Sequence, residues 1–225
     1  MRDIDRGIAA ALAASAITSV IGFLSVPVYV RFLGVEGYGL VGFLATLQAL
    51  QFIVAVYFIC SFTLRFVFPA FSIEKKTAWI LASAPINFRR IYFGKYLFYS
   101  LFFVAVGILM SYINIGILNL PFTYAAYSIL LFVSVVIFII TLGLSLGAIF
   151  PNFETDDPEI ISTSMPGLFF TALSLIYGAL GAGVLYSSLA GGNTSGLLFF
   201  VILTFILIAI ILQKTPSLAG NRDLS

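Results

Sequence analysis

The side chains that could do chemistry gather in one acidic stretch. It places four carboxylates within six positions, without a basic residue among them: Glu154, Asp156, Asp157 and Glu159. Clustered carboxylates can bind calcium, but the ligand spacing and the glycine of an EF-hand loop are absent. A solvated loop is the simplest interpretation. The alternative is a complementary contact with the basic region 75–95 or with a partner, which salt would screen.

Other reactive side chains are scarce. The chain has no His, and its one Cys, Cys60, lies in an apolar run that favours a small buried hydrophobe. The residue clusters that bind zinc or haem are missing, as is the most common general base. A Gly-rich phosphate loop ending in Lys-Ser/Thr does not occur either. We therefore expect no enzymatic activity and no metal or cofactor.

The composition is that of a membrane protein. Of 225 residues, 61% are hydrophobic and 9% are charged, whereas a soluble domain carries roughly 25% charged residues. So few charges cannot cover a water-soluble globule, and membrane lipid is the expected surrounding. The net charge of +2 provides no large basic patch, which argues against nucleic acid as a partner.

Runs without charged residues mark the membrane spans, because a bilayer core needs about 20 apolar residues per helix. Six spans are predicted, at Ile8–Val30, Gly39–Phe62, Tyr96–Leu118, Thr123–Phe150, Gly167–Leu189 and Ser195–Gln213. All Lys and Arg except Arg31 fall on one side of this arrangement, which places both termini in the cytoplasm. The expected fold is an all-α, multi-pass protein of the cell membrane.

The cytoplasmic segment 63–95 separates the first two spans (1–62) from a four-helix region (96–213) and a cytoplasmic tail (214–225). Ser72 can cap an amphipathic helix with Glu74 in its first turn, and Pro85 ends it. Trp79 suits the membrane interface.

Asn87 can cap the next helix, which enters the bilayer past three basic residues, Arg89, Arg90 and Lys95. These charges are also explained by the positive-inside rule and contact with anionic lipid.

Two stretches resemble permeases of ATP-binding-cassette exporters: residues 68–85, with Arg89-Arg90 and Gly94-Lys95 following, and residues 142–153. The resemblance covers roughly residues 52–213. It implies a transmembrane subunit driven by a separate cassette ATPase, paired with a second copy or a second permease subunit. It also implies that the partner docks on a set of cytoplasmic residues: Glu74, Trp79, Pro85, Arg89, Arg90 and Lys95.

Residues 22–39 resemble another family, the flippases of polysaccharides and lipid-linked oligosaccharides. The similarity runs from about residue 1 to residue 50 and covers only the opening helix pair of a larger fold. A fusion, a gene fragment joined near Leu50, or a divergent permease would each explain the combination.

The bilayer interior holds no ionisable residue in the last four spans, which favours an energy source outside the chain. Small residues at Gly143 and Gly147, and at Gly178 and Ala182, let helices approach closely. They serve either internal packing or a dimer face. Several mild polar groups could line a path or bond a neighbouring helix: Asn114, Thr141, Thr171, Ser174 and Tyr177.

Three functions follow. The leading one is the permease subunit of an ATP-driven exporter without ATPase activity of its own. A truncated or fused flippase is the second, and a membrane scaffold or fragment that transports nothing is the third.

Overall fold

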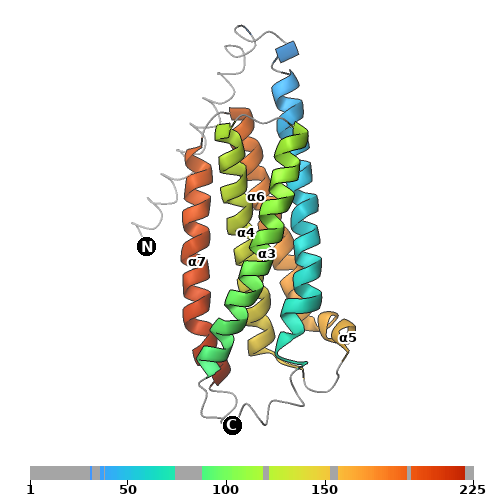
Figure 1. The fold of residues 1–225 in the computed structure, drawn as a ribbon, viewed down its shortest axis with the longest axis vertical. Helices are drawn as coiled ribbons and strands as arrows, with labels where there is room; N and C mark the ends of the chain where they lie inside the picture. The colour runs from blue at the N-terminus through green and yellow to red at the C-terminus, as the bar shows by residue number, and fades with distance from the viewer. Residues whose placement is uncertain are drawn as a thin grey trace, which may run out of the picture.

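The computed structural model describes residues 31, 36–37, 39–73, 88–118, 122–152, 157–191 and 194–220, and every regular element in these ranges is a helix. Five of these helices are long and apolar enough to cross a membrane: Gly39–Ala70, α3 (Phe88–Leu118), α4 (Phe122–Ile149), α6 (Met165–Gly191) and α7 (Ser195–Gly220). They run along the long axis of the molecule, with the short α5 (Pro158–Ser162) at one end (Figure 1). The predicted all-α, multi-pass class is confirmed. The first predicted span, residues 8–30, lies outside the described residues.

Helix α4 is the centre of the bundle. In its most apolar window 72% of the residues are buried, against 11–33% in the other four helices. It packs against α3, α6, α7 and the end of the Gly39–Ala70 helix. Its buried polar residues are hydroxyls rather than charges: Ser128, Ser134, Thr141 and Ser145. The outer helices expose many large apolar side chains, as expected where lipid replaces water as the solvent.

The first described helix continues beyond its predicted end at Phe62. It passes through a π turn, η1 (Thr63–Val67), and a 3₁₀ turn, η2 (Phe68–Ala70). Pro69 explains the change, because proline has no N–H and clashes with the carbonyl four residues earlier. The Phe68 N–H bonds Thr63 O, five residues back, and this wider turn brings the chain to Pro69 without breaking the helix.

Helix α3 begins at Phe88, before the predicted span start at Tyr96. Arg89, Arg90 and Lys95 are therefore helical residues. This start is where a cap at Asn87 would place it. The helix can begin eight residues before the predicted start at Tyr96 because Arg89 and Arg90 are exposed. Long charged side chains at a helix end can reach the polar interface. The predicted amphipathic helix falls on residues 74–87, outside the described residues.

Helix α7 likewise continues past Gln213, so residues 214–220 of the predicted tail are helical. Thr215 and Ala219, four positions apart, are both buried, and this packing holds the added turns. Pro216 lies inside the helix, where it removes one hydrogen bond. The Thr215 hydroxyl donates to Ile211 O at 2.8 Å.

The connections alternate between the two ends of the bundle. The end of the Gly39–Ala70 helix, the start of α3, α5 and the end of α7 lie together. The end of α3, the start of α4, the end of α6 and the start of α7 lie at the opposite end (Figure 1). This is the alternation that the predicted topology requires. The first of these ends, called here the basic end, carries Arg65, Arg89, Arg90, Lys95 and Lys214.

Candidate functional site

At the basic end, Lys95 joins two helices. Its Nζ donates a hydrogen bond to Ala70 O at 2.7 Å and lies 4.3 Å from the centre of the Phe71 ring. Carbonyls at a helix end lack partners within the helix, and the dipole favours a cation there. Lys95, predicted to dock a partner, therefore closes the end of the Gly39–Ala70 helix.

The two neighbouring arginines are arranged differently. Arg89 and Arg90 are exposed in the first turn of α3, and the Arg89 guanidinium lies 5.6 Å from the Phe93 ring centre. Both remain accessible to a partner at the basic end. The other predicted docking residues, Glu74, Trp79 and Pro85, lie outside the described residues.

A second connection crosses the basic end at Ser72. This residue is 1% exposed, and its Oγ accepts a hydrogen bond from the Asn152 backbone N–H at 3.0 Å. The predicted role of Ser72 was to cap a following helix. The helix that it would cap lies outside the described residues, so that role stays a prediction. Its bond to Asn152 ties the end of the Gly39–Ala70 helix to the loop after α4, a contact that local sequence reasoning missed.

Half of the acidic cluster has a structural role. Asp157 precedes α5 and accepts from the Glu159 backbone N–H at 2.9 Å, and Glu159 lies in the first turn of that helix. Both positions favour carboxylates. Glu154 and Asp156 lie outside the described residues. In the ranges that the structure describes, no three His, Cys, Asp or Glu side chains gather to hold a metal.

Two buried hydroxyls join α3 to α4 near the same end. Tyr92 OH and Ser145 Oγ are 2.8 Å apart, and Tyr92 is fully buried against the Phe71 ring at a centroid distance of 6.3 Å. Together with Lys95 and Ser72, this bond makes the ends of the Gly39–Ala70 helix, α3 and α4 one connected unit.

The predicted small-residue positions lie at close approaches inside the bundle. A Cβ on Gly147 would overlap the Phe68 carbonyl oxygen, and one on Gly143 would lie 2.7 Å from Thr63 Cγ2. On α6, a Cβ on Gly178 would overlap Val56 Cγ1.

Ala182, also on α6, is 3% exposed. Gly143, Gly147, Gly178 and Ala182 therefore all pack against neighbouring helices of the same chain. They do not form an exposed face for a dimer.

Most of the mild polar groups bond within their own or a neighbouring helix. Thr141 and Thr171 donate to carbonyls one turn back, and the Tyr177 hydroxyl bonds Thr204 on α7. Ser174 is fully buried, with the Cys60 thiol as its neighbour. The Asn114 side chain is outside the described part.

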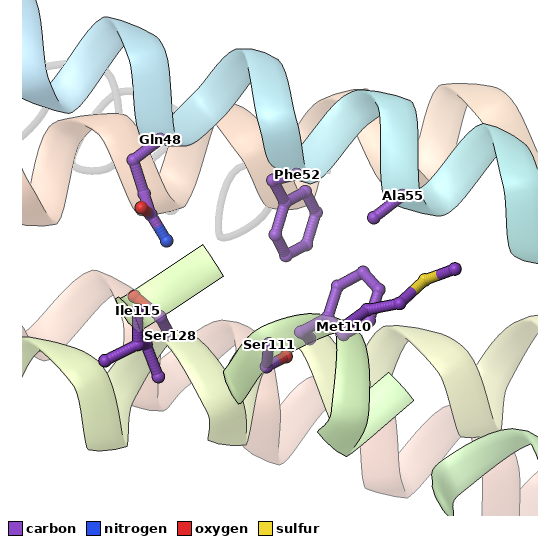
Figure 2. A pocket seen from close by; sticks show the side chains of 8 residues that line it. Gln48, Phe52, Ala55, Met110, Ser111, Ile115 and Ser128 are labelled. Carbon is purple, nitrogen blue, oxygen red and sulfur yellow. The ribbon is translucent and has the colours of Figure 1, made fainter. Parts of the chain in front are cut away.

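Sequence reasoning missed a small pocket of about 20 Å³ between three helices, which holds three polar side chains in a mostly apolar lining. Its lining comes from the Gly39–Ala70 helix, α3 and α4: Gln48, Phe52, Ala55, Met110, Ser111, Ile115, Ser128 and Phe132. The Gln48 amide extends across the gap toward the helices that carry Ser111 and Ser128 (Figure 2). The two glutamines of this largely apolar span, Gln48 and Gln51, were the signal that could have indicated it.

Two polar atoms of this pocket are buried without a hydrogen-bond partner among the described residues. Gln48 is 2% exposed and Ser128 is 5% exposed. Within the described ranges, neither Gln48 Oε1 nor Ser128 Oγ has a hydrogen-bond partner. Gln48 lies nine residues into its helix, roughly 13 Å from the helix start.

The comparison with protein families identifies one match. Residues 40–191, more than half of the chain, match the family model described as "Putative ATP-binding cassette". No curated protein and no solved structure matches the chain.

Proposed function

We propose that this chain, which belongs to the family described as "Putative ATP-binding cassette", is a transport subunit. Specifically, it would be the membrane-spanning subunit of an ATP-driven exporter. The observation that carries the proposal is the combination of this family with the five long apolar helices. The family name refers to ATP, but the sequence contains no phosphate-binding loop with Lys-Ser/Thr. A separate ATPase would therefore supply the energy, and the chain itself would not be an enzyme.

The charge-free bilayer interior supports an external energy source. No Asp, Glu, Lys or Arg occurs between Tyr96 and Phe153, or between Ile160 and Gln213. Transport driven by protons or sodium ions commonly uses an ionisable group at membrane depth. ATP hydrolysis by a partner needs no such group in this chain.

The basic end offers a surface on which the ATPase partner could dock. Arg89 and Arg90 are exposed there, and the bonds of Lys95, Ser72 and Tyr92 connect three helix ends behind them. A partner that moved this unit would move the Gly39–Ala70 helix, α3 and α4 together. Because basic loops remain on the inner side, this end would face the cytoplasm.

Affinity purification from native membranes tests the docking. The unmodified chain should recover a cassette ATPase, identified by mass spectrometry after mild cross-linking. Reversing both charges, Arg89→Glu and Arg90→Glu, should reduce the recovery at least several-fold. Arg31→Glu, which changes an exposed charge on the predicted outer side, is the matched control and should leave it unchanged. Repeated absence of any cassette ATPase from the wild-type sample would overturn the proposal.

A transport assay separates the proposal from an ion-coupled carrier. Vesicles that contain the chain and its ATPase should move solute only with ATP present. Solute movement driven by an ion gradient without nucleotide would contradict an ATP-driven subunit.

A further inference from the structure

The pocket between Gln48, Ser111 and Ser128 has a chemistry that the proposed function does not use. In an apolar membrane bundle, a polar atom without a partner is costly, because neither lipid nor a neighbouring side chain replaces the lost water. Here two such atoms, Gln48 Oε1 and Ser128 Oγ, line one cavity from two helices. Their shared position suggests a common partner.

The size and lining of the cavity define that partner. Its volume of about 20 Å³ exceeds the roughly 10–15 Å³ that one water requires, and a buried water needs two to four polar neighbours. The pocket offers an amide and two hydroxyls. No charged side chain lines it, so an ion would lack a counter-charge.

Two aromatic rings form part of the pocket wall. Phe52 and Phe132 meet edge to face with ring centres 5.3 Å apart. Phe52 and Ser128 are both nearly fully buried. A cavity lined only by such rings would stay dry, whereas the polar groups make this one suitable for water.

We propose that the pocket is a hydration site inside the membrane, which holds one water molecule between Gln48 of the Gly39–Ala70 helix and Ser128 of α4, with Ser111 of α3 beside it. The water accepts and donates hydrogen bonds and so joins the three helices. The site is independent of transport and of any ATPase partner.

The direction in which Ser128→Ala changes the unfolding temperature tests whether the pocket holds a water. With water bound, Ser128→Ala removes one of its partners and should lower the unfolding temperature of the detergent-solubilised protein by about 2–4 °C. In a dry pocket the same change removes an unsatisfied hydroxyl and leaves that temperature unchanged or higher. Ser188→Ala is the matched control, because Ser188 is also buried and unpaired among the described residues but lies outside the pocket. The proposal would be overturned if the unfolding temperature of Ser128→Ala rose or did not change. It would also be overturned if the unfolding temperatures of Ser128→Ala and Ser188→Ala fell equally.

Radiolytic footprinting tests it directly. Hydroxyl radicals formed from a bound water should oxidise Met110, which lines the pocket, to the sulfoxide. In the double variant Gln48→Leu/Ser128→Ala, the oxidation of Met110 should fall several-fold, while that of Met165, 82% exposed, should not change. Met110 is also partly exposed, so some oxidation from the surroundings remains in both proteins. No fall of Met110 oxidation in the double variant would contradict the proposal.

Discussion

Lys95 Nζ donates a 2.7 Å hydrogen bond to the carbonyl oxygen of Ala70, so a cation of α3 closes the end of the preceding helix. The side chain also covers the Phe71 ring. A residue that charge counting places on the cytoplasmic surface is thus part of the packing between two helices.

Replacing this cation should destabilise the basic end. Lys95→Met removes the bond to Ala70 O and is expected to cost about 1.5–3 kcal/mol, the range for hydrogen bonds to charged groups. Arg90→Met, an exposed substitution five residues earlier on α3, should stay within about 0.5 kcal/mol. Unfolding in detergent followed by circular dichroism measures both. Equal stability of the two variants would contradict a structural role for Lys95.

Gly147 should tolerate no side chain. Gly147→Ala places a methyl group against the Phe68 carbonyl oxygen, and overpacking of this kind costs about 1–3 kcal/mol. Gly183→Ala is the control, since nothing lies within 4 Å of its added Cβ. Within a helix, that change should be neutral or stabilising by up to about 1 kcal/mol. The unfolding temperature of Gly147→Ala should therefore fall, while that of Gly183→Ala should stay the same or rise. Equal changes in the two variants would contradict the close approach at Gly147.

Ser72→Ala should loosen the contact between the Gly39–Ala70 helix and the loop after α4. It removes the acceptor of the partly buried Asn152 N–H, at an expected cost of about 0.5–1.5 kcal/mol. Hydrogen exchange at Asn152 should become faster. Ser61→Ala, whose exposed hydroxyl bonds only its own helix at Tyr57 O, should leave that exchange rate unchanged. No acceleration in Ser72→Ala would contradict the role of this bond.

The orientation of the bundle can be read with single cysteines, because Cys60 is the only native one. In a Cys60→Ala background, Thr194→Cys at the α6–α7 connection should react with a membrane-impermeant thiol reagent in intact cells. Arg90→Cys at the basic end should react only after permeabilisation. The reverse pattern would place the basic end outside and contradict the positive-inside prediction.

The helical class and five of the six predicted spans were readable from the sequence, because lipid does not hydrate charges and the charge-free runs therefore mark where helices cross. The same local pattern predicted the close-packing glycines at Gly143 and Gly147. Helix ends were less accurate. The π turn before Pro69 and the start at Phe88 follow a proline and exposed arginines, which charge gaps do not take into account. The end at Gly220 depends on the packing of Thr215 and Ala219.

What only the tertiary structure decided involves residues far apart in the chain. Tyr92 and Ser145 are 53 positions apart, and Ser72 and Asn152 are 80 apart, so no local spacing indicates that they bond. The central place of α4 and the polar pocket at Gln48 have the same origin. A hydrophobic sequence specifies that helices enter the bilayer, whereas the shapes and hydrogen bonds of facing side chains decide which helices meet.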